Sequence, residues 1–267
     1  MEPFWKTHSM PQGSVLHWQI GPLELWVRHL PGEWQVVHRS ADDDDLIHRW
    51  TLGEPASFPG DARFKRFAVD PGRDQDQLIL RPRFPDRSIV SRPASPIEIP
   101  SGTQARFYCG IPIWVRLEAA SSGGPVHLTT VPVHDLSRTW FGTPLEGEAC
   151  YATKSLAVRD FRELEKLGFR ALCPVKIRNT SGESLPFERI CLRVRHLALF
   201  QGADYLWTNT SSILKRANQP VSEVTFGKHP PGEEKGAQLV EPAREPATPH
   251  ATLLRTFGNL RSITDLP

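Results

Sequence analysis

The sequence has no long hydrophobic run, and this absence argues against a membrane-spanning helix. No window approaches the about 18 consecutive apolar residues that such a helix needs, and runs such as GIPIWV (110–115) have the length of a strand. The first residues, MEPFWKTHSMPQG, also lack the apolar core of a signal peptide. From these two absences we expect a soluble, cytoplasmic protein.

Cysteine is scarce, and its spacing argues against a zinc ribbon. The four cysteines, Cys109, Cys150, Cys173 and Cys191, form no CxxC pair. Each lies in an apolar run of strand length, so we expect buried, reduced thiols that behave as small hydrophobic side chains. A metal cluster or a disulfide is the alternative interpretation.

Motifs for phosphate binding and for nucleophilic catalysis are absent too. The chain has no GxxxxGK[ST], GxGxxG or GxSxG pattern. His134, Asp135 and Ser137 form the nearest local triad-like group, but adjacent residues of a strand point to opposite faces. The acidic run 42–45 could bind a hard cation, yet it lacks the alternating ligands of an EF-hand, and we interpret it as a solvated turn. We predict no catalytic residue, no metal and no cofactor.

Charge of either sign is not in excess. The chain has 32 basic and 30 acidic residues, a formal net charge of +2. The basic residues between positions 63 and 106 are interleaved with aspartates, which is typical of solvated strand edges. Nucleic acid is therefore not an expected partner.

Short apolar runs between Gly/Pro turns dominate the chain, which has 25 prolines and 19 glycines. Three such runs open it: VLHWQI (15–20), LELWVRHL (23–30) and WQVVHRS (34–40). Leu16, Trp18 and Ile20 alternate with polar residues, as a half-buried strand requires. This pattern predicts an all-β fold, an antiparallel β-sandwich with an N-terminal β-meander and at most one or two short helices. The expected division is a meander subdomain (1–83), a sandwich domain (84–227), a flexible proline-rich linker (228–252) and a docking segment (253–267).

One segment, DFRELEKLGF (160–169), has a helical pattern. Asp160 stands where an N-cap would, Glu163 follows three residues later, and Gly168 would end the helix. We predict about two helical turns there.

The end of the chain combines a charged, proline-rich stretch with an apolar segment. The stretch has the composition of a solvated linker. The apolar residues after it recur at roughly helical spacing and are Leu253, Leu254, Phe257, Leu260 and Ile263. We expect this segment to dock either on its own sandwich or in a groove of another chain, including a second copy.

The stretch LSRTWFGTPLEGEACYATK (136–154) is the strongest candidate for a binding site, because aromatic residues and arginine dominate binding hot spots. Its candidate residues are Arg138, Trp140, Phe141, Glu146, Glu148 and Tyr151. On an extended backbone one of the two consecutive rings faces the core, and we expect Trp140 to be that ring. In the alternative interpretation both rings close the end of the sandwich, and Arg138 bridges to Glu148.

Three segments, PDRSIVSRPASPIEIPSG (85–102), FYCGIPIWV (107–115) and LSRTWFGTPLEGEACYA (136–152), carry a family resemblance. Together they resemble an uncharacterised archaeal and bacterial family catalogued as domain of unknown function four hundred and thirty-two. The resemblance covers residues 14 to 208, and the acidic residue often found after the turn's glycine is Thr143 here. Genes of this family are often neighbours of genes for small mechanosensitive channels, and this association implies a channel's cytoplasmic part as one partner.

Two functions follow as hypotheses. The first is a non-catalytic cytoplasmic module that binds another protein. The second is a ligand-binding or hydrolytic β-sandwich with a pocket near Trp140 and Tyr151. A concave site with several convergent polar groups would favour the second, and a flat aromatic patch the first.

Overall fold

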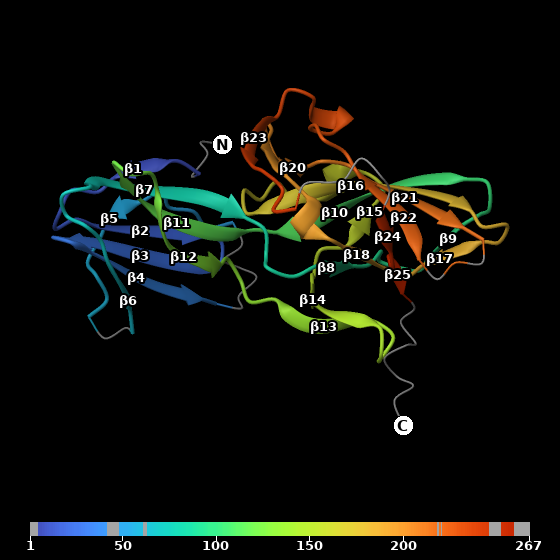
Figure 1. Cartoon of the computed structure of the whole chain (residues 1–267), viewed down its shortest axis with the longest axis horizontal. Helices are drawn as coiled ribbons and strands as arrows, with labels where there is room; N and C mark the ends of the chain where they lie inside the picture. Colours follow the sequence, from blue (N-terminus) through green and yellow to red (C-terminus); the bar gives the residue numbers. More distant parts are fainter. Residues whose placement is uncertain are drawn as a thin grey trace. The chain divides into compact units, whose positions relative to one another are not determined.

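The computed structural model describes residues 5–41, 48–60, 63–217, 219, 221–245 and 252–258, and the chain divides into two compact units (Figure 1). The first unit is Met1–Arg83 with Ile113–Asp135, and the second is Phe84–Pro112 with Leu136–Pro267. Both units are built from strands, mostly in antiparallel pairs, so the predicted all-β class is confirmed. The described helical residues are confined to short 3-10 turns, and no described helix is long and apolar enough to cross a membrane.

The first unit contains two sheets. One has the order β5 (Glu54–Pro55), β2 (Val15–Ile20), β3 (Leu23–Leu30), β4 (Glu33–Ser40) and β6 (Lys65–Ala68). The other has the order β1 (Thr7–Ser9), β7 (Asp74–Arg83), β11 (Trp114–Ser121) and β12 (Val126–Pro132). Strands β11 and β12 return to this unit from the middle of the chain, so the predicted sandwich domain is interrupted at 113–135.

The strands β2, β3 and β4 pair in sequence order as a meander, and alternation of apolar residues is clearest in β3. Every second residue of β3 is buried, beginning with Leu23, Leu25 and Val27. The next position of this buried series is His29, a polar side chain that is fully buried. The alternation therefore places a titratable ring on the core face of the first unit.

The second unit contains a nine-stranded, a five-stranded and a two-stranded sheet. Seven strands of the nine-stranded sheet follow the order β23 (Gln238–Glu241), β19 (Leu199–Gln201), β20 (Leu206–Thr208), β16 (Arg170–Thr180), β21 (Ser211–Arg216), β22 (Ser222–Phe226) and β24 (Thr252–Leu254). The other two are β10 (Gln104–Pro112), which pairs with β16, and β15 (Ala157–Val158), which pairs with β10. The five-stranded sheet runs β13 (Ser137–Gly142), β14 (Gly147–Ala152), β8 (Ile89–Ser91), β18 (Arg189–Leu192) and β25 (Phe257–Gly258). Strand β9 (Ile97–Ile99) pairs with β17 (Leu185–Phe187). The β14–β8 pair is parallel, and it brings residues about 60 positions apart into one sheet.

The predicted helix at 160–169 is a single 3-10 turn, Phe161–Glu163. Asp160 caps this turn, and the capping box with Glu163 is present, so the predicted start is correct. The chain leaves the helical conformation at Leu164, which has extended backbone angles. Leu164 and Leu167 are both buried, and the extended path delivers both side chains to the core, which outweighs the local helical preference.

Residues 228–245, predicted to be part of a flexible linker, are instead an ordered part of the second unit. Glu233, in the 3-10 turn Gly232–Glu234, accepts a hydrogen bond of 2.6 Å from the Tyr108 hydroxyl and forms an ion pair with Arg106. Strand β23 pairs with β19, and Ala237 is buried. Pairing of this kind gives the backbone N–H and C=O groups of a polar segment their hydrogen-bond partners. It does not require an apolar composition, so sequence patterns do not detect it.

The predicted docking segment forms strands rather than a helix where the structure describes it. Leu253 and Leu254 lie in β24, which pairs with β22, and Phe257 lies in β25, which pairs with β18. The segment 252–258 therefore docks on its own chain. Leu260 and Ile263 lie outside the described residues.

Candidate functional site

The predicted binding stretch is a hairpin of β13 and β14, and its tight turn depends on Gly142. This residue has a φ of +125°, and a side chain there would meet the main-chain oxygen of Glu146 at 2.4 Å. Within the turn the Thr143 hydroxyl accepts a hydrogen bond of 2.9 Å from the amide of Glu146. The hairpin therefore has one well-defined geometry, and it carries all six predicted site residues.

The two consecutive aromatic rings of the hairpin face opposite ways, but the expected assignment was wrong. Phe141 is the core ring, with 1% of its surface exposed, and it packs with Val90, Cys150 and Cys191. Trp140 is 46% exposed and donates a hydrogen bond of 2.8 Å from its indole nitrogen to the Thr143 oxygen. Trp140 is thus a surface ring held over the turn.

Next to β14 the second unit has a polar cleft of about 210 Å³. Its lining residues are Asp86, Arg87, Ser88, Glu148, Ala149, Val194, Arg195 and Arg244. Of the six predicted residues, Glu148 lines this cleft, and Tyr151 touches its rim by donating a hydrogen bond of 3.0 Å to Asp86. Burial, together with this bond, raises the pKa of Tyr151. The cleft is concave and polar, as the ligand-binding hypothesis expects.

Glu148 is held in the cleft wall by two partners. Its Oε1 atom forms an ion pair with the Nη2 atom of Arg193 at 2.6 Å, and its Oε2 atom accepts a hydrogen bond of 3.0 Å from the Ser88 hydroxyl. Arg138, expected to bridge to Glu148, is exposed and lies opposite Tyr151 in the strand register. Glu146 lies in the turn, where its carboxylate is 3.7 Å from Arg255.

Three arginines converge on the cleft. Arg244 donates a hydrogen bond of 2.6 Å to the Pro85 oxygen, and burial lowers its pKa, while Arg195 lowers it further by charge repulsion. Arg195 forms an exposed ion pair of 3.2 Å with Glu245. Arg87 lies 3.8 Å from Asp86. The lowered pKa of Arg244 shows that its surroundings in the folded protein disfavour its charge.

A pair of thiols lies behind Glu148. The sulfur atoms of Cys150 and Cys191 are 3.8 Å apart, and their two side chains and the Glu148 carboxylate each offer a ligand atom within 4.8 Å of the others. The hydrogen bond between the two thiols lowers the pKa of Cys150, whereas burial raises the pKa of Cys191. All four cysteines of the chain are buried and free, as predicted.

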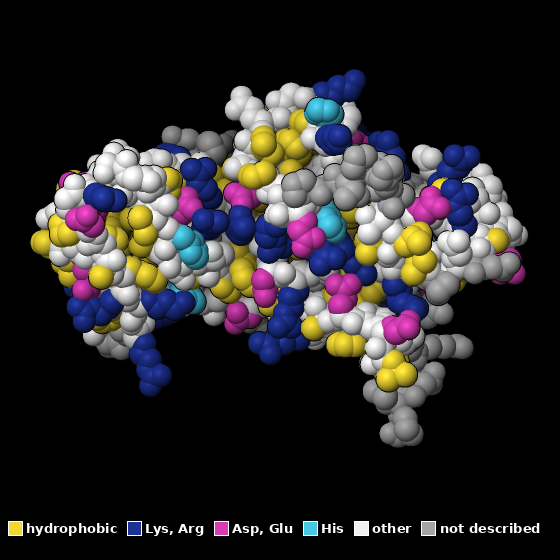
Figure 2. All heavy atoms as spheres, viewed as in Figure 1, with side chains coloured by type: hydrophobic (Ala, Val, Ile, Leu, Met, Phe, Trp, Pro, Cys, Tyr) yellow, Lys and Arg dark blue, Asp and Glu magenta, His cyan; other side chains and the backbone are white. Residues whose placement is uncertain are grey.

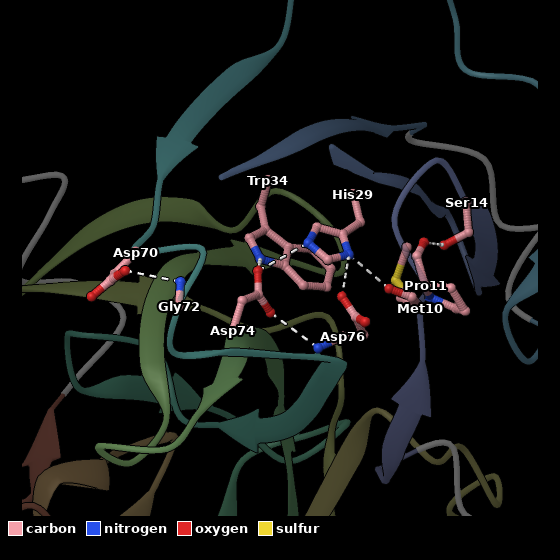
Figure 3. A network of polar contacts seen from close by, with 9 residues as sticks. All are labelled: Met10, Pro11, Ser14, His29, Trp34, Asp70, Gly72, Asp74 and Asp76. Atoms are coloured by element: carbon pink, nitrogen blue, oxygen red, sulfur yellow. Dashed lines mark hydrogen bonds and ion pairs between the residues drawn. The ribbon is translucent and has the colours of Figure 1, made fainter. Parts of the chain in front are cut away.

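The first unit has a different polar cluster, centred on His29 (Figure 3). Its Nε2 atom lies 2.9 Å from the Asp74 carboxylate, which also accepts a bond of 3.1 Å from the indole of Trp34. Its Nδ1 atom lies 2.7 Å from the Met10 oxygen and 3.6 Å from Asp76. Figure 3 shows these acceptors at opposite edges of the ring. His29 and Trp34 belong to one sheet and Asp74 to the other, so the cluster joins the two sheets.

The His29 cluster is better suited to stability than to binding. The ring is fully buried and stacked on Trp34 at a centroid distance of 4.0 Å. Asp74 also borders a groove of about 310 Å³ lined mostly by small side chains. The charged groups of that groove are already paired, Asp70 with Arg73 at 3.4 Å and Asp74 with His29. We focus on the cleft of the second unit because three arginines line it.

The sequence matches the model of a family described as Protein of unknown function (DUF432) over residues 4–261. The chain belongs to this family. The match confirms the resemblance and extends beyond the expected 14–208 into the C-terminal segment. No curated protein and no solved structure matches the chain.

Sequence patterns missed most of the cleft in this DUF432 chain. Arg87 and Ser88 lie in a segment that carries the family resemblance, but nothing in their spacing indicated a site. Arg195 follows β18, and Arg244 lies in the segment interpreted as a linker. Basic and acidic side chains are also interleaved over the face seen in Figure 2, so composition did not single out these arginines.

Proposed function

We propose that the chain is a non-catalytic binding protein whose second unit captures a small anionic ligand in the arginine-lined cleft. The observation that supports this most directly is the convergence of Arg87, Arg195 and Arg244 on one concave site. Guanidinium groups suit carboxylate and phosphate groups, which accept two parallel hydrogen bonds.

The electrostatics of Arg244 favour an anion. Burial removes hydration from its charge, and the neighbouring carboxylates Asp86 and Glu245 compensate for this only in part. The pKa of Arg244 is therefore still lowered. A bound anion would neutralise Arg244 and relieve its repulsion with Arg195. The Ser88 hydroxyl at the same wall can donate to an anion if it turns away from Glu148.

The size of the cleft limits the ligand. A volume of about 210 Å³ is below the range of about 300–1,000 Å³ that is typical of pockets for drug-sized molecules. We therefore expect a small phosphate- or carboxylate-bearing compound, or one such group of a larger molecule.

Isothermal titration calorimetry of the full chain with inorganic phosphate and with citrate tests the proposal. We expect Arg244→Gln to weaken binding by about 10-fold or more, because a hydrogen bond to a charged group contributes about 1.5–3 kcal/mol. Arg138→Gln is the matched control, since this arginine is exposed on the neighbouring hairpin outside the cleft. Binding that is equally weak in both variants, or absent in the wild type for every anion tried, would contradict the proposal.

A second candidate function is protein docking at the tip of the hairpin. Leu145 is 96% exposed there and Trp140 46%, and β13 is an edge strand whose backbone groups can pair with another strand. The partner proposed is another protein or a second copy of this chain, and the channel implied by the family resemblance stays a prediction. Light scattering over a range of concentrations tests self-association, with Leu145→Ser as the variant and Leu239→Ser, at a site 58% exposed, as the control.

A further inference from the structure

The two sulfur atoms behind the cleft have the separation that a metal ion requires. Zinc binds thiolates at about 2.3 Å, and two such bonds at the tetrahedral angle place the sulfurs about 3.8 Å apart. The sulfurs of Cys150 and Cys191 are 3.8 Å apart. The pair therefore has the spacing of two thiolate ligands of one metal ion before any ion is bound.

A disulfide would require the two sulfurs to move closer together. Cys150 lies in β14 and Cys191 in β18, and β8 runs between these two strands. Their sulfurs are 3.8 Å apart, whereas the sulfurs of a disulfide are about 2.0 Å apart. A shared metal ion needs no such approach, because two thiolates bound to one Zn²⁺ ion keep the observed separation.

Glu148 can supply a third ligand without losing its partners. A carboxylate has about four lone-pair positions, and Arg193 and Ser88 use one on each oxygen. Such outer partners are what orient a carboxylate ligand at metal sites. With two thiolates, one carboxylate, the Arg193 cation and a divalent ion, the formal charges sum to zero. A buried site needs this balance, because unpaired buried charge is costly.

The site also has an entry path. Glu148 lines the open cleft, and its side chain is 39% exposed, whereas both cysteines are buried. An ion can reach the carboxylate first and then the sulfurs. The fourth coordination position would lie toward the cleft, where water can occupy it.

We propose that Glu148, Cys150 and Cys191 form a binding site for a thiophilic divalent cation, with Zn²⁺ as the best match. Two sulfur ligands and one carboxylate favour Zn²⁺ over Mg²⁺ or Ca²⁺, which prefer oxygen ligands alone. The site shares Glu148 and Ser88 with the wall of the anion cleft, but none of its three ligands is an arginine, so the two proposals can be tested separately.

Titration of the reduced, metal-stripped full chain with Co²⁺ tests this proposal, because cobalt bound by thiolate absorbs through sulfur-to-metal charge transfer. We expect one Co²⁺ per chain, displaced by Zn²⁺ and not by Mg²⁺. Cys150→Ser and Cys191→Ser should each abolish the charge-transfer band. The double variant Cys109→Ser, Cys173→Ser should keep the charge-transfer band, because Cys109 in β10 and Cys173 in β16 lie opposite each other outside the site. Ser88→Ala should weaken affinity by about 10–100-fold, as the loss of an outer partner does.

A measurement on the wild type keeps the test independent of how the variants fold. Zn²⁺ should slow alkylation of Cys150 and Cys191 by iodoacetamide, and mass spectrometry of the peptides locates the protected residues. The proposal is overturned if the reduced wild type gives no thiolate–cobalt band. It is also overturned if Cys150 and Cys191 are alkylated at the same rate with and without Zn²⁺. Arg244→Gln should leave Co²⁺ binding intact, which separates this result from the test of the anion cleft.

Discussion

Replacing Asp74 by alanine should destabilise the first unit strongly. The Asp74 carboxylate accepts from the His29 ring at 2.9 Å and from the Trp34 indole at 3.1 Å, and its own side chain is 2% exposed. The other nitrogen of His29 faces the Met10 oxygen at 2.7 Å, so the ring meets acceptors on both sides. Asp74 is the shared buried acceptor of the His29 and Trp34 rings.

The size of the effect follows from this geometry. Removing the carboxylate leaves the buried His29 ring and the buried Trp34 indole without this acceptor, and each unsatisfied buried group costs about 1–3 kcal/mol. Loss of the acceptor for Trp34 is part of the same cluster and does not add fully to this cost. We expect a loss of about 3–5 kcal/mol from the free energy of unfolding of the first unit.

Urea unfolding followed by tryptophan fluorescence measures this loss, because six of the eight tryptophans lie in the first unit. Asp70→Ala is the matched control, since Asp70 lies nearby on an exposed turn and pairs with Arg73 at the surface. Its effect should stay near about 0.5 kcal/mol. The double variant His29→Leu, Asp74→Leu should recover much of the loss, because both polar partners are replaced by apolar side chains. Equal effects of Asp74→Ala and Asp70→Ala would refute the assignment of His29 and Asp74 as a buried pair.

Three further predictions concern single residues. In urea unfolding, Phe141→Ala should lower the free energy of unfolding of the second unit by about 3–5 kcal/mol, because it leaves a cavity at a buried site. Trp140→Ala, at a half-exposed site, should lower it by about 1 kcal/mol. Equal losses would contradict the assignment of Phe141 as the buried ring and Trp140 as the surface ring. Gly142→Ala should disrupt the hairpin, because the φ of Gly142 is +125° and the added carbon would meet the main-chain oxygen of Glu146. Hydrogen exchange of the hairpin amides should therefore be faster than in the wild type, and an unchanged rate would refute this. Burial and Lys65 lower the pKa of His38, so the unfolded chain takes up its proton first as the pH falls below about 6.5. The melting temperature of the first unit should therefore fall with decreasing pH in that range, and it should fall less in His38→Gln; identical pH profiles would show that His38 does not contribute.

The sequence alone determined the class of the fold and the position of its most distinctive hairpin. Strand alternation and Gly/Pro turns are local, so the meander of β2, β3 and β4 and the turn at Gly142 could be predicted from neighbouring residues. The capping residues of the turn at 161–163 were local as well. Alternation also required that one of Trp140 and Phe141 face inward, but not which one, because that depends on the strand next to β14.

Only the tertiary structure decided which distant residues meet. The partner of His29 is Asp74, 45 residues away on another sheet, and no pattern around either residue predicts the pair. Arg87, Arg195 and Arg244 form one cleft because β8, β14 and β18 are neighbours in one sheet and the segment after β23 returns to it. Cys150 and Cys191, 41 residues apart, come together through the same pairing. The segment 228–245 was misjudged for a related reason: its order comes from backbone pairing with β19 and from Glu233, and such contacts leave no periodic trace in the sequence.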